Sequence, residues 1–272
     1  MMCRILGVSR SGYYAWLDRE ESKRQRDDRT LIELIKQVHS SSKGAYGAPR
    51  VYAELRAEGY LFGMNRIAKL MQRIGLKGCP RKRVYRSLRK EDKHPPAPNL
   101  LARKFNVKEP NRFWASDITY IHTRQGLLYL AVVMDLYSRK IVGWAMDSRM
   151  SRHLTIEALK MALQMRKPSS GLVHHSDRGA QYACDDYREL LLNYGIECSM
   201  SASGNCYDNA VVESFFGMLK RERIRRYRYL TRREAEVDIF DYIECFYNRK
   251  RRHGYLGYIS PNQFEQKTLH VN

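Results

Sequence analysis

The sequence has no uninterrupted run of about 18 apolar residues, the length that a helix needs to cross a membrane. Its first ten residues carry Arg4 and Arg10, with no apolar run between them long enough for a secretory signal. Six cysteines are scattered among 272 residues, without a Cys-x-x-Cys pair or histidines at zinc-finger spacing. We therefore expect a cytoplasmic protein with reduced thiols, no zinc module and no membrane partner.

Acidic residues are scarce relative to basic ones. The chain has 29 Asp and Glu against 49 Lys and Arg, which gives a formal net charge of +20. Hydrophobic residues make up 43% of the chain and aromatic residues 11%, which is too much apolar material for a disordered basic tail. A folded protein with this charge attracts polyanions, either nucleic acid or an anionic membrane surface, and we favour nucleic acid.

Proline is also infrequent, and its distribution divides the chain. Three of the 8 prolines fall within KHPPAPN at residues 93–99. This composition ends a preceding helix and extends the backbone. We place the domain boundary here, with a helical DNA-binding region at residues 1–98 and a catalytic domain at residues 99–272.

Helical periodicity dominates the first region. One amphipathic stripe consists of Leu31, Leu34, Ile35 and Val38. A second helix begins near Pro49 and ends near Gly59, and a third has an apolar face of Ile67, Leu70, Met71 and Ile74. The last two helices, joined by residues 59–64, predict a helix-turn-helix whose second helix enters the major groove. The alternative is a small helical bundle with a solvated basic face.

Basic side chains on and after the third helix favour DNA binding over that alternative. We expect phosphate or base contacts from the basic residues of the helix and of the run that follows it, namely Arg66, Lys69, Arg73, Arg81, Lys82 and Arg83.

The periodicity changes after the boundary. Strands are predicted at 113–123, 127–136, 140–146, 171–176 and 196–201, and helices at 152–166, 185–194 and 208–223. The first three strands are expected to form an antiparallel meander. The order βββαβαβα matches a ribonuclease-H-like α/β fold with a mixed sheet, preceded by the small all-α region.

Three carboxylates fall where this layout brings chain segments together. Asp117 lies in the first strand, Asp177 follows the fourth strand, and Glu213 lies on the later helix. Neighbouring strands are about 4.8 Å apart, so Asp117 and Asp177 are expected at one edge of a cleft, with Glu213 above them. Taken singly, each residue has a structural alternative: an Arg pair, a helix cap or a surface salt bridge.

A divalent cation would make such a cluster tolerable. Two carboxylates about 5 Å apart repel by roughly 3 kcal/mol at an effective dielectric of about 20. Oxygen-only ligation selects Mg²⁺ or Mn²⁺ rather than zinc. Two ions about 4 Å apart can activate an attacking oxygen and stabilise a leaving oxygen at a phosphodiester. We predict two Mg²⁺ ions, replaceable by Mn²⁺, at Asp117, Asp177 and Glu213.

We also predict roles for several residues near these motifs. Asn209, Glu213 and Lys220 share one helix face, and we expect Asn209 and Lys220 to contact DNA, with Lys220 directing a cation at it. We expect one of His174 and His175 to pack and the other to form a hydrogen bond. The basic run at 249–253, which follows an amphipathic helix and includes Arg252 and His253, is expected to hold phosphates.

At these residues the sequence resembles the second-frame (OrfB-type) transposases of the IS-three group of bacterial insertion sequences, whose core is shared with retroviral integrases. The resemblance spans nearly the whole chain, including the helix-turn-helix segments YGAPRVYAELRAEGY and NRIAKLMQRIGLKG. The matching core segments are WASDITYI at 114–121, LYLAVVMDLYSRKIVGW at 128–144, HSDRGAQY at 175–182, MSASGNCYDNAVVESFFGMLK at 200–220 and YNRKRRHGYLGYISP at 247–261.

The resemblance implies a DDE recombinase with Asp117, Asp177 and Glu213 as metal ligands and Lys220 as the basic residue after the glutamate. It implies cleavage at double-stranded transposon ends and transfer of the freed 3′-hydroxyl to target DNA, in a bacterial, nucleoid-associated setting. It also implies an upstream-frame product that is joined to this chain by frameshifting. Since joining two ends takes one catalytic core at each, we expect a homo-oligomer, at least a dimer on DNA. Activity of the chain alone and activity only as that fusion are both open.

Two other functions fit parts of the pattern. A repressor built on the helix-turn-helix would bind element ends without Mg²⁺, and a ribonuclease-H-like nuclease would cut without rejoining. A covalent serine or tyrosine recombinase is disfavoured, because no base is placed to activate such a nucleophile.

Overall fold

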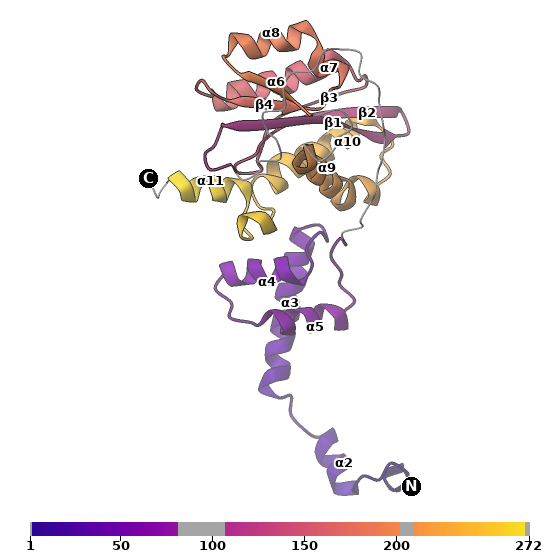
Figure 1. Cartoon of the computed structure of the whole chain (residues 1–272). Helices are drawn as coiled ribbons and strands as arrows, with labels where there is room; N and C mark the ends of the chain where they lie inside the picture. Colours follow the sequence, from indigo (N-terminus) through magenta and orange to yellow (C-terminus); the bar gives the residue numbers. More distant parts are fainter. Residues whose placement is uncertain (1, 81–106, 202–208, 270–272) are drawn as a thin grey trace. The chain divides into compact units, whose positions relative to one another are not determined.

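The computed structural model describes residues 2–80, 107–201 and 209–269 and separates the chain into two units, residues 1–78 and residues 79–272 (Figure 1). The boundary predicted at 93–99 lies outside the described residues. Across the described ranges, no helix combines the length and the apolar composition that spanning a membrane requires.

The first unit is helical, as expected. It contains α1 (Met2–Ile5), α2 (Arg10–Leu17), α3 (Lys23–Ser41), α4 (Ala48–Ala57) and α5 (Met64–Arg73). A capping box of Ser22 and Gln25 begins α3, and Pro49 lies in the first turn of α4. The predicted stripes form the core, with Ile35 of α3, Leu55 of α4 and Ile67 of α5 all buried. The predicted pair of helices is therefore present as α4 and α5.

The second unit is built on a five-stranded mixed sheet. Its strands are β1 (Phe113–Thr123), β2 (Gly126–Asp135), β3 (Ile141–Asp147), β4 (Val173–Ser176) and β5 (Glu197–Met200), in the spatial order β3-β2-β1-β4-β5. The first three strands pair antiparallel, and β4 and β5 add in parallel to β1. The predicted meander and the ribonuclease-H-like order are confirmed, and β1 lies at the centre.

Helices cover both faces of this sheet (Figure 1). On one side lie α6 (Arg152–Arg166), the short α7 (Ala180–Ala183) and α8 (Asp185–Asn193); on the other lie α9 (Ala210–Glu222) and α10 (Arg232–Phe240). A 3₁₀ turn (Ile224–Arg226) follows α9, a π-helical segment (Asp241–Tyr247) continues α10, and a second 3₁₀ turn (Gly254–Leu256) precedes α11 (Pro261–Leu269). The sequence did not predict α7 or the π-helical segment.

Close packing of α6 on the sheet depends on one glycine. A methyl group at Gly143 of β3 would lie 2.2 Å from the carbonyl oxygen of Ala158 and 2.7 Å from the backbone nitrogen of Ala162. Only a residue without Cβ lets α6 approach the strand this closely.

At the first residue of β3, a side-chain amide occupies the hydrogen-bonding groups of the outer edge. Asn248 accepts a hydrogen bond from the Ile141 backbone nitrogen and donates one to the Ile141 carbonyl oxygen, both at 3.0 Å. Further along β3, the backbone nitrogen of Trp144 donates to the Met161 sulfur at 3.4 Å. The two Asn248 bonds fasten the segment after α10 to the edge of the sheet.

A buried ion pair fastens the same segment to α9. Arg251 donates from Nε and Nη2 to the two carboxylate oxygens of Glu222, at 2.8 and 2.6 Å, and Tyr242 donates to the same carboxylate at 2.9 Å. All three side chains are buried, so each charge is compensated within the protein.

Candidate active site

Asp117 and Asp177 lie on neighbouring parallel strands in matching positions. The register pairs Ala115 of β1 with His175 of β4, and each aspartate lies two residues beyond that pair. Asp117 is half-buried and accepts a hydrogen bond from the Ile118 backbone nitrogen at 2.7 Å. Asp177 is exposed and accepts one from the Gly179 backbone nitrogen at 2.9 Å. The sheet therefore presents both carboxylates at one edge.

Glu213 comes from the first turn of α9, which packs on β1 through its apolar face. Asn209, the residue that precedes α9, is buried, and its Nδ2 donates to the Ser116 carbonyl oxygen at 3.0 Å. This bond fixes the start of α9 beside the strand residue that precedes Asp117. Asn209 was predicted to contact DNA; in this structure its side chain is buried and ties the start of α9 to β1.

Electrostatics connect the three carboxylates. The pKa of Asp117 is raised to about 8, first because burial removes water from the carboxylate and then because the negative charge of Asp177 lies nearby. The charge of Glu213 raises it further, while the Ile118 hydrogen bond and the cation of Lys220 lower it. Asp117 is therefore harder to deprotonate than a solvent-exposed aspartate. A cation bound between the carboxylates would lower its pKa again.

The carboxylates do not form a finished metal cage in this conformation. Among residues 2–80, 107–201 and 209–269, no three His, Cys, Asp or Glu side chains are gathered closely enough to hold a metal ion. Negative charge on neighbouring carboxylates opposes their closer approach. The donor chemistry still suits a hard divalent cation, because all three groups offer carboxylate oxygens and nothing softer.

The two histidines before Asp177 are both hydrogen-bonded within the core. His174 Nε2 lies 2.7 Å from Ser116 Oγ and 3.0 Å from the Tyr187 hydroxyl. His175 Nδ1 lies 2.8 Å from Ser199 Oγ. The expectation that one of them would only pack was wrong, because a serine from a neighbouring strand lies beside each ring.

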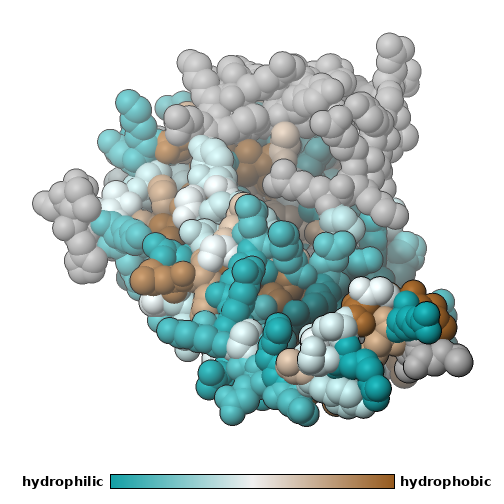
Figure 2. Space-filling view, turned by 90° about the horizontal axis from the view of Figure 1, so that it is seen from below, coloured by the Kyte–Doolittle hydropathy of each residue, from teal (hydrophilic) through white to brown (hydrophobic). Residues whose placement is uncertain are grey.

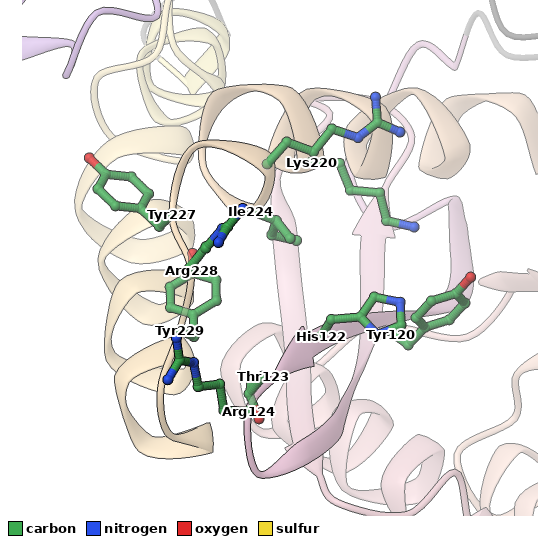
Figure 3. A pocket seen from close by; sticks show the side chains of 10 residues that line it. Tyr120, His122, Thr123, Arg124, Lys220, Ile224, Tyr227, Arg228 and Tyr229 are labelled. Carbon is green, nitrogen blue, oxygen red and sulfur yellow. The ribbon is translucent and has the colours of Figure 1, made fainter.

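A basic and aromatic groove has Lys220 in its lining. Lys220 Nζ lies 5.2 Å from the centre of the Tyr120 ring, and its charge acts on Asp117. The groove, with a volume of about 460 Å³, is open to solvent and continues between the end of β1 and the segment after α9 (Figure 3). Its lining is Tyr120, His122, Thr123, Arg124, Lys220, Ile224, Arg225, Tyr227, Arg228 and Tyr229.

Sequence reasoning missed all of this groove except Lys220. One signal was available in β1, where Tyr120 and His122 are exposed and Ile121 between them is buried. That alternation places an aromatic and an imidazole on one face of the strand end. The opposite wall had no such signal, since residues 227–229 form no helix or strand of their own.

The predicted DNA contacts of the helical unit differ in their surroundings. Lys69 and Arg73 are exposed and four residues apart on α5, so they share a face. Arg66 is half-buried, and its guanidinium donates from Nε to Asp28 of α3 at 2.7 Å. Arg66 therefore ties α5 to α3 in this structure. Arg81, Lys82 and Arg83 lie outside the described residues.

The basic run at 249–253 is divided between the surface and the interior. Arg251 forms the buried pair with Glu222, and Arg252 is buried with its Nη1 donating to the Tyr258 carbonyl oxygen at 3.1 Å. His253 is half-buried and its backbone nitrogen donates to the Ile259 carbonyl oxygen. The expectation of one continuous DNA-holding face is therefore unsupported at Arg251 and Arg252, because both guanidinium groups bind within the chain.

Comparison with known families gives three matches along the chain. Residues 107–206 and residues 213–269 each match a family described as an integrase core domain, and residues 25–84 match an HTH-like domain. The HTH-like match includes α4 and α5, which agrees with the helix-turn-helix expected from the sequence.

Individual proteins resemble the chain over nearly its full length. An insertion element IS600 31 kDa protein of Shigella sonnei is 46% identical over 267 residues, covering 98% of both chains. Transposase InsF for insertion sequence IS3A of Escherichia coli strain K12 is 44% identical over 270 residues, covering 98% of this chain and 94% of InsF. A simian T-cell lymphotropic virus intasome contains a chain of similar fold, with a TM-score of 0.50, 16% identity, and coverage of 85% of this chain and 73% of the viral chain.

Proposed function

Because the chain belongs to the integrase-core transposases of the IS-three (IS3) group of insertion sequences, we propose that Asp117, Asp177 and Glu213 are its catalytic carboxylates. The protein is a DDE-type transposase, an enzyme of insertion-sequence transposition. The proposal assigns to the three residues the cleavage of element ends and the transfer of each freed 3′-hydroxyl to a new phosphodiester.

The observation that carries this proposal is the placement of Asp117 and Asp177 at matching positions of neighbouring parallel strands, with Glu213 in the first turn of a helix that packs on β1. The raised pKa of Asp117 agrees with this placement, because Asp177 and Glu213 add negative charge to a carboxylate that burial already deprives of water. Gathering like charges costs a fold stability, and pKa shifts of this kind cluster at functional sites. If each carboxylate had a separate structural role, there would be no reason for the three to interact electrostatically.

We propose that the three carboxylates hold two Mg²⁺ ions, for which Mn²⁺ can substitute. Bound there, the ions would activate the attacking oxygen and neutralise charge on the leaving oxygen of a phosphodiester. Asp117 and Asp177 are carried by the rigid sheet, and Asn209 fixes the start of the helix that carries Glu213. We therefore expect a modest movement of the Glu213 side chain to complete the site.

The surrounding cations position DNA in this proposal. Lys220 lies on the same helix as Glu213 and contributes positive charge next to Asp117, where a phosphate would lie. In the helical unit, Lys69 and Arg73 contact element DNA from α5, with further contacts from Arg81, Lys82 and Arg83. Joining two element ends requires one catalytic unit at each, so the acting species is a homo-oligomer of at least two chains.

The experiment that tests the proposal replaces Glu213 by its neutral isostere. Purified Glu213→Gln protein is incubated with labelled DNA carrying the ends of its own element, in Mg²⁺ and separately in Mn²⁺. The upstream-frame product is present in one series and absent in another. The matched control is Glu189→Gln, which removes one exposed carboxylate from α8, remote from the site in sequence and on a different element.

We expect Glu213→Gln to bind end DNA as the wild type does and to lose cleavage and strand transfer at least 100-fold, while Glu189→Gln retains both. Undiminished strand transfer by Glu213→Gln would refute the catalytic assignment. Wild-type binding without any cleavage, in either series, would favour the repressor, and cleavage without joining would favour the nuclease.

A further inference from the structure

One buried side chain beside the strand-borne carboxylates carries a polar atom that the fold does not use. Tyr182, on the short helix α7, is 2% exposed, and within the described ranges its hydroxyl has no hydrogen-bond partner. A buried polar group without a partner costs free energy, and native proteins contain few of them. Packing alone therefore explains the ring of Tyr182 and not its hydroxyl.

The neighbouring tyrosine of the core differs in this respect. The rings of Tyr182 and Tyr187 meet edge to face with their centres 5.4 Å apart, and both side chains are buried. The Tyr187 hydroxyl lies 3.0 Å from His174 Nε2, within hydrogen-bond distance. Among the residues that the structure describes, the same environment thus provides a partner for one hydroxyl and none for the other.

A hydrogen-bonded turn holds Tyr182 against Asp177. The backbone nitrogen of Gly179 donates to Asp177 Oδ1 at 2.9 Å, and the backbone nitrogen of Tyr182 donates to the Gly179 carbonyl oxygen at 2.9 Å. A methyl group at Gly179 would lie 2.9 Å from Asp177 Oδ1 and 3.6 Å from Cδ2 of the Tyr182 ring. The carboxylate and the ring therefore flank the same glycine, with no side chain of that residue between them.

The Tyr182 hydroxyl keeps its proton in this position. Burial raises the pKa of Tyr182 well above its ordinary value of 10, and the nearby Tyr187 and the charges of Asp117 and Asp177 raise it further. The hydroxyl therefore has a hydrogen to donate at neutral pH. Carboxylates are the strongest acceptors for it, because a hydrogen bond to a charged group is roughly twice as strong as one between neutral groups.

Both aspartates have acceptor capacity for such a donor. Asp117 Oδ1 accepts from the Ile118 backbone nitrogen and Asp177 Oδ1 from that of Gly179. An ionised carboxylate offers about four acceptor positions on its two oxygens. Carboxylates that hold a metal ion are themselves oriented by hydrogen bonds from neighbouring groups, and these bonds contribute to the affinity for the ion.

We propose that Tyr182 is a positioning residue of the cation site: its hydroxyl donates to the carboxylate pair of Asp117 and Asp177 when the pair closes on a divalent ion, and so fixes the orientation in which they hold the ion. The inference rests on the proposed function, because it takes these aspartates as the cation ligands. It adds a residue that contacts neither the ion nor DNA and still sets the affinity for the ion. In the ion-free fold the hydroxyl stays unpaired, so its benefit belongs to ion binding and not to folding.

The test makes the same substitution at two buried tyrosines of the full-length chain. Tyr182→Phe removes the unpaired hydroxyl, and the control Tyr247→Phe removes a hydroxyl that donates to the Arg139 carbonyl oxygen at 3.0 Å. Affinity for Mn²⁺ is measured by electron paramagnetic resonance of the free ion, without DNA. Stability is measured as the midpoint of urea unfolding at neutral pH, with chelator and no divalent ion. Asp177→Asn is the reference for loss of the cation site.

We expect Tyr182→Phe to bind Mn²⁺ at least about 10-fold more weakly than the wild type, the usual effect of removing a group that orients a metal ligand. Its urea midpoint should be no lower than that of the wild type, because no hydrogen bond of the ion-free fold is lost. Tyr247→Phe should show the opposite pattern, with wild-type Mn²⁺ affinity and a lower midpoint. Asp177→Asn should lose Mn²⁺ binding.

Wild-type Mn²⁺ affinity in Tyr182→Phe would overturn the inference, and so would a weaker affinity accompanied by a lower urea midpoint, which indicates a structural role for the hydroxyl. The two levels of the argument separate through Asp177→Asn. If that variant loses Mn²⁺ binding while Tyr182→Phe retains it, the cation site stands and Tyr182 has no part in it. If Asp177→Asn binds Mn²⁺ as the wild type does, the cation site itself is wrong and the inference falls with it.

Discussion

At the scale of single residues, His174 shows how the interior beneath the site is organised. Its side chain is fully buried between Ser116 and Tyr187. Burial, together with the nearby His175, lowers the pKa of His174 to about 3, which favours the neutral ring throughout the physiological range. A charged imidazole at this position would have no compensation, so the fold depends on the ring remaining neutral.

This dependence predicts a loss of stability in acid. Between pH 6.5 and pH 3 the unfolded chain protonates His174 and the folded chain does not, so the free energy of unfolding falls as the pH falls, by up to about 1.4 kcal/mol per pH unit. His174→Gln keeps a polar side chain but cannot titrate, and should show a shallower decline. Urea unfolding at pH 7, 6 and 5, without divalent ions, measures both slopes.

The matched control is His153→Gln, an exposed histidine on α6. Its decline should equal that of the wild type. Equal slopes for His174→Gln and the wild type would mean that His174 does not account for the acid sensitivity.

The sequence was informative about acids and much less so about their partners. The sequence allowed Asp117, Asp177 and Glu213 to be singled out. Clustering carboxylates costs free energy, so a cluster of them points to cation binding. The surroundings of Asn209, Arg66 and Arg252 could not be predicted in this way. An amide or a guanidinium serves equally well for a phosphate or for a carbonyl, and only the tertiary structure decides which one lies within reach.

At the scale of elements, the packing of α6 against β3 depends on Gly143. Gly143→Ala should lower the free energy of unfolding by about 1–3 kcal/mol, the usual cost of forcing extra volume into a packed core, because its methyl group would collide with backbone atoms of α6. Backbone cannot rotate aside as a flexible side chain can. Chemical denaturation at neutral pH provides the measurement.

Gly254→Ala is the control for this prediction, since no atom lies within 4 Å of a Cβ at that position. Its stability should stay within about 0.5 kcal/mol of the wild type. If Gly143→Ala is equally harmless, α6 must be free to move away from the sheet, and the close approach is not required.

Regular elements were predictable because each repeats a simple period. The strand at 113–123 and the helix at 152–166 have the bounds expected from alternation and from helical spacing. The π-helical segment was missed because it continues the apolar stripe of α10 with no change in composition. Its wider turn lets Tyr247 donate to the Arg139 carbonyl oxygen, a contact that no local pattern encodes.

At the scale of the whole molecule, positive charge dominates. The formal net charge is +20, and hydrophilic side chains cover much of the face shown in Figure 2, with hydrophobic ones in separate patches. Such a field draws any DNA toward the protein, so affinity alone cannot reveal which cations contact phosphates. Salt dependence can, because each neutralised phosphate contributes a slope of about 0.9.

We predict that Arg81→Ala combined with Arg83→Ala lowers the slope of log affinity against log salt concentration by up to about 2, while cleavage at saturating protein persists. The control is Lys160→Ala combined with Lys267→Ala, which removes the same charge from exposed positions on α6 and α11. Fluorescence anisotropy between 50 and about 200 mM salt gives the slopes. Equal slopes in the two double variants would mean that the loss of net charge, and not the loss of specific phosphate contacts, explains the change.

The way in which β3 is closed has a consequence for the protein in concentrated solution. Outer strands attract foreign strands through their free backbone groups, and this is how fibrous aggregates begin. Here Asn248 takes the place of a neighbouring strand at Ile141, the Met161 sulfur accepts from the Trp144 amide, and the opposite outer strand, β5, is four residues long. Neither strand edge therefore offers a long template for recruitment, which protects the protein against sheet-to-sheet association at high concentration.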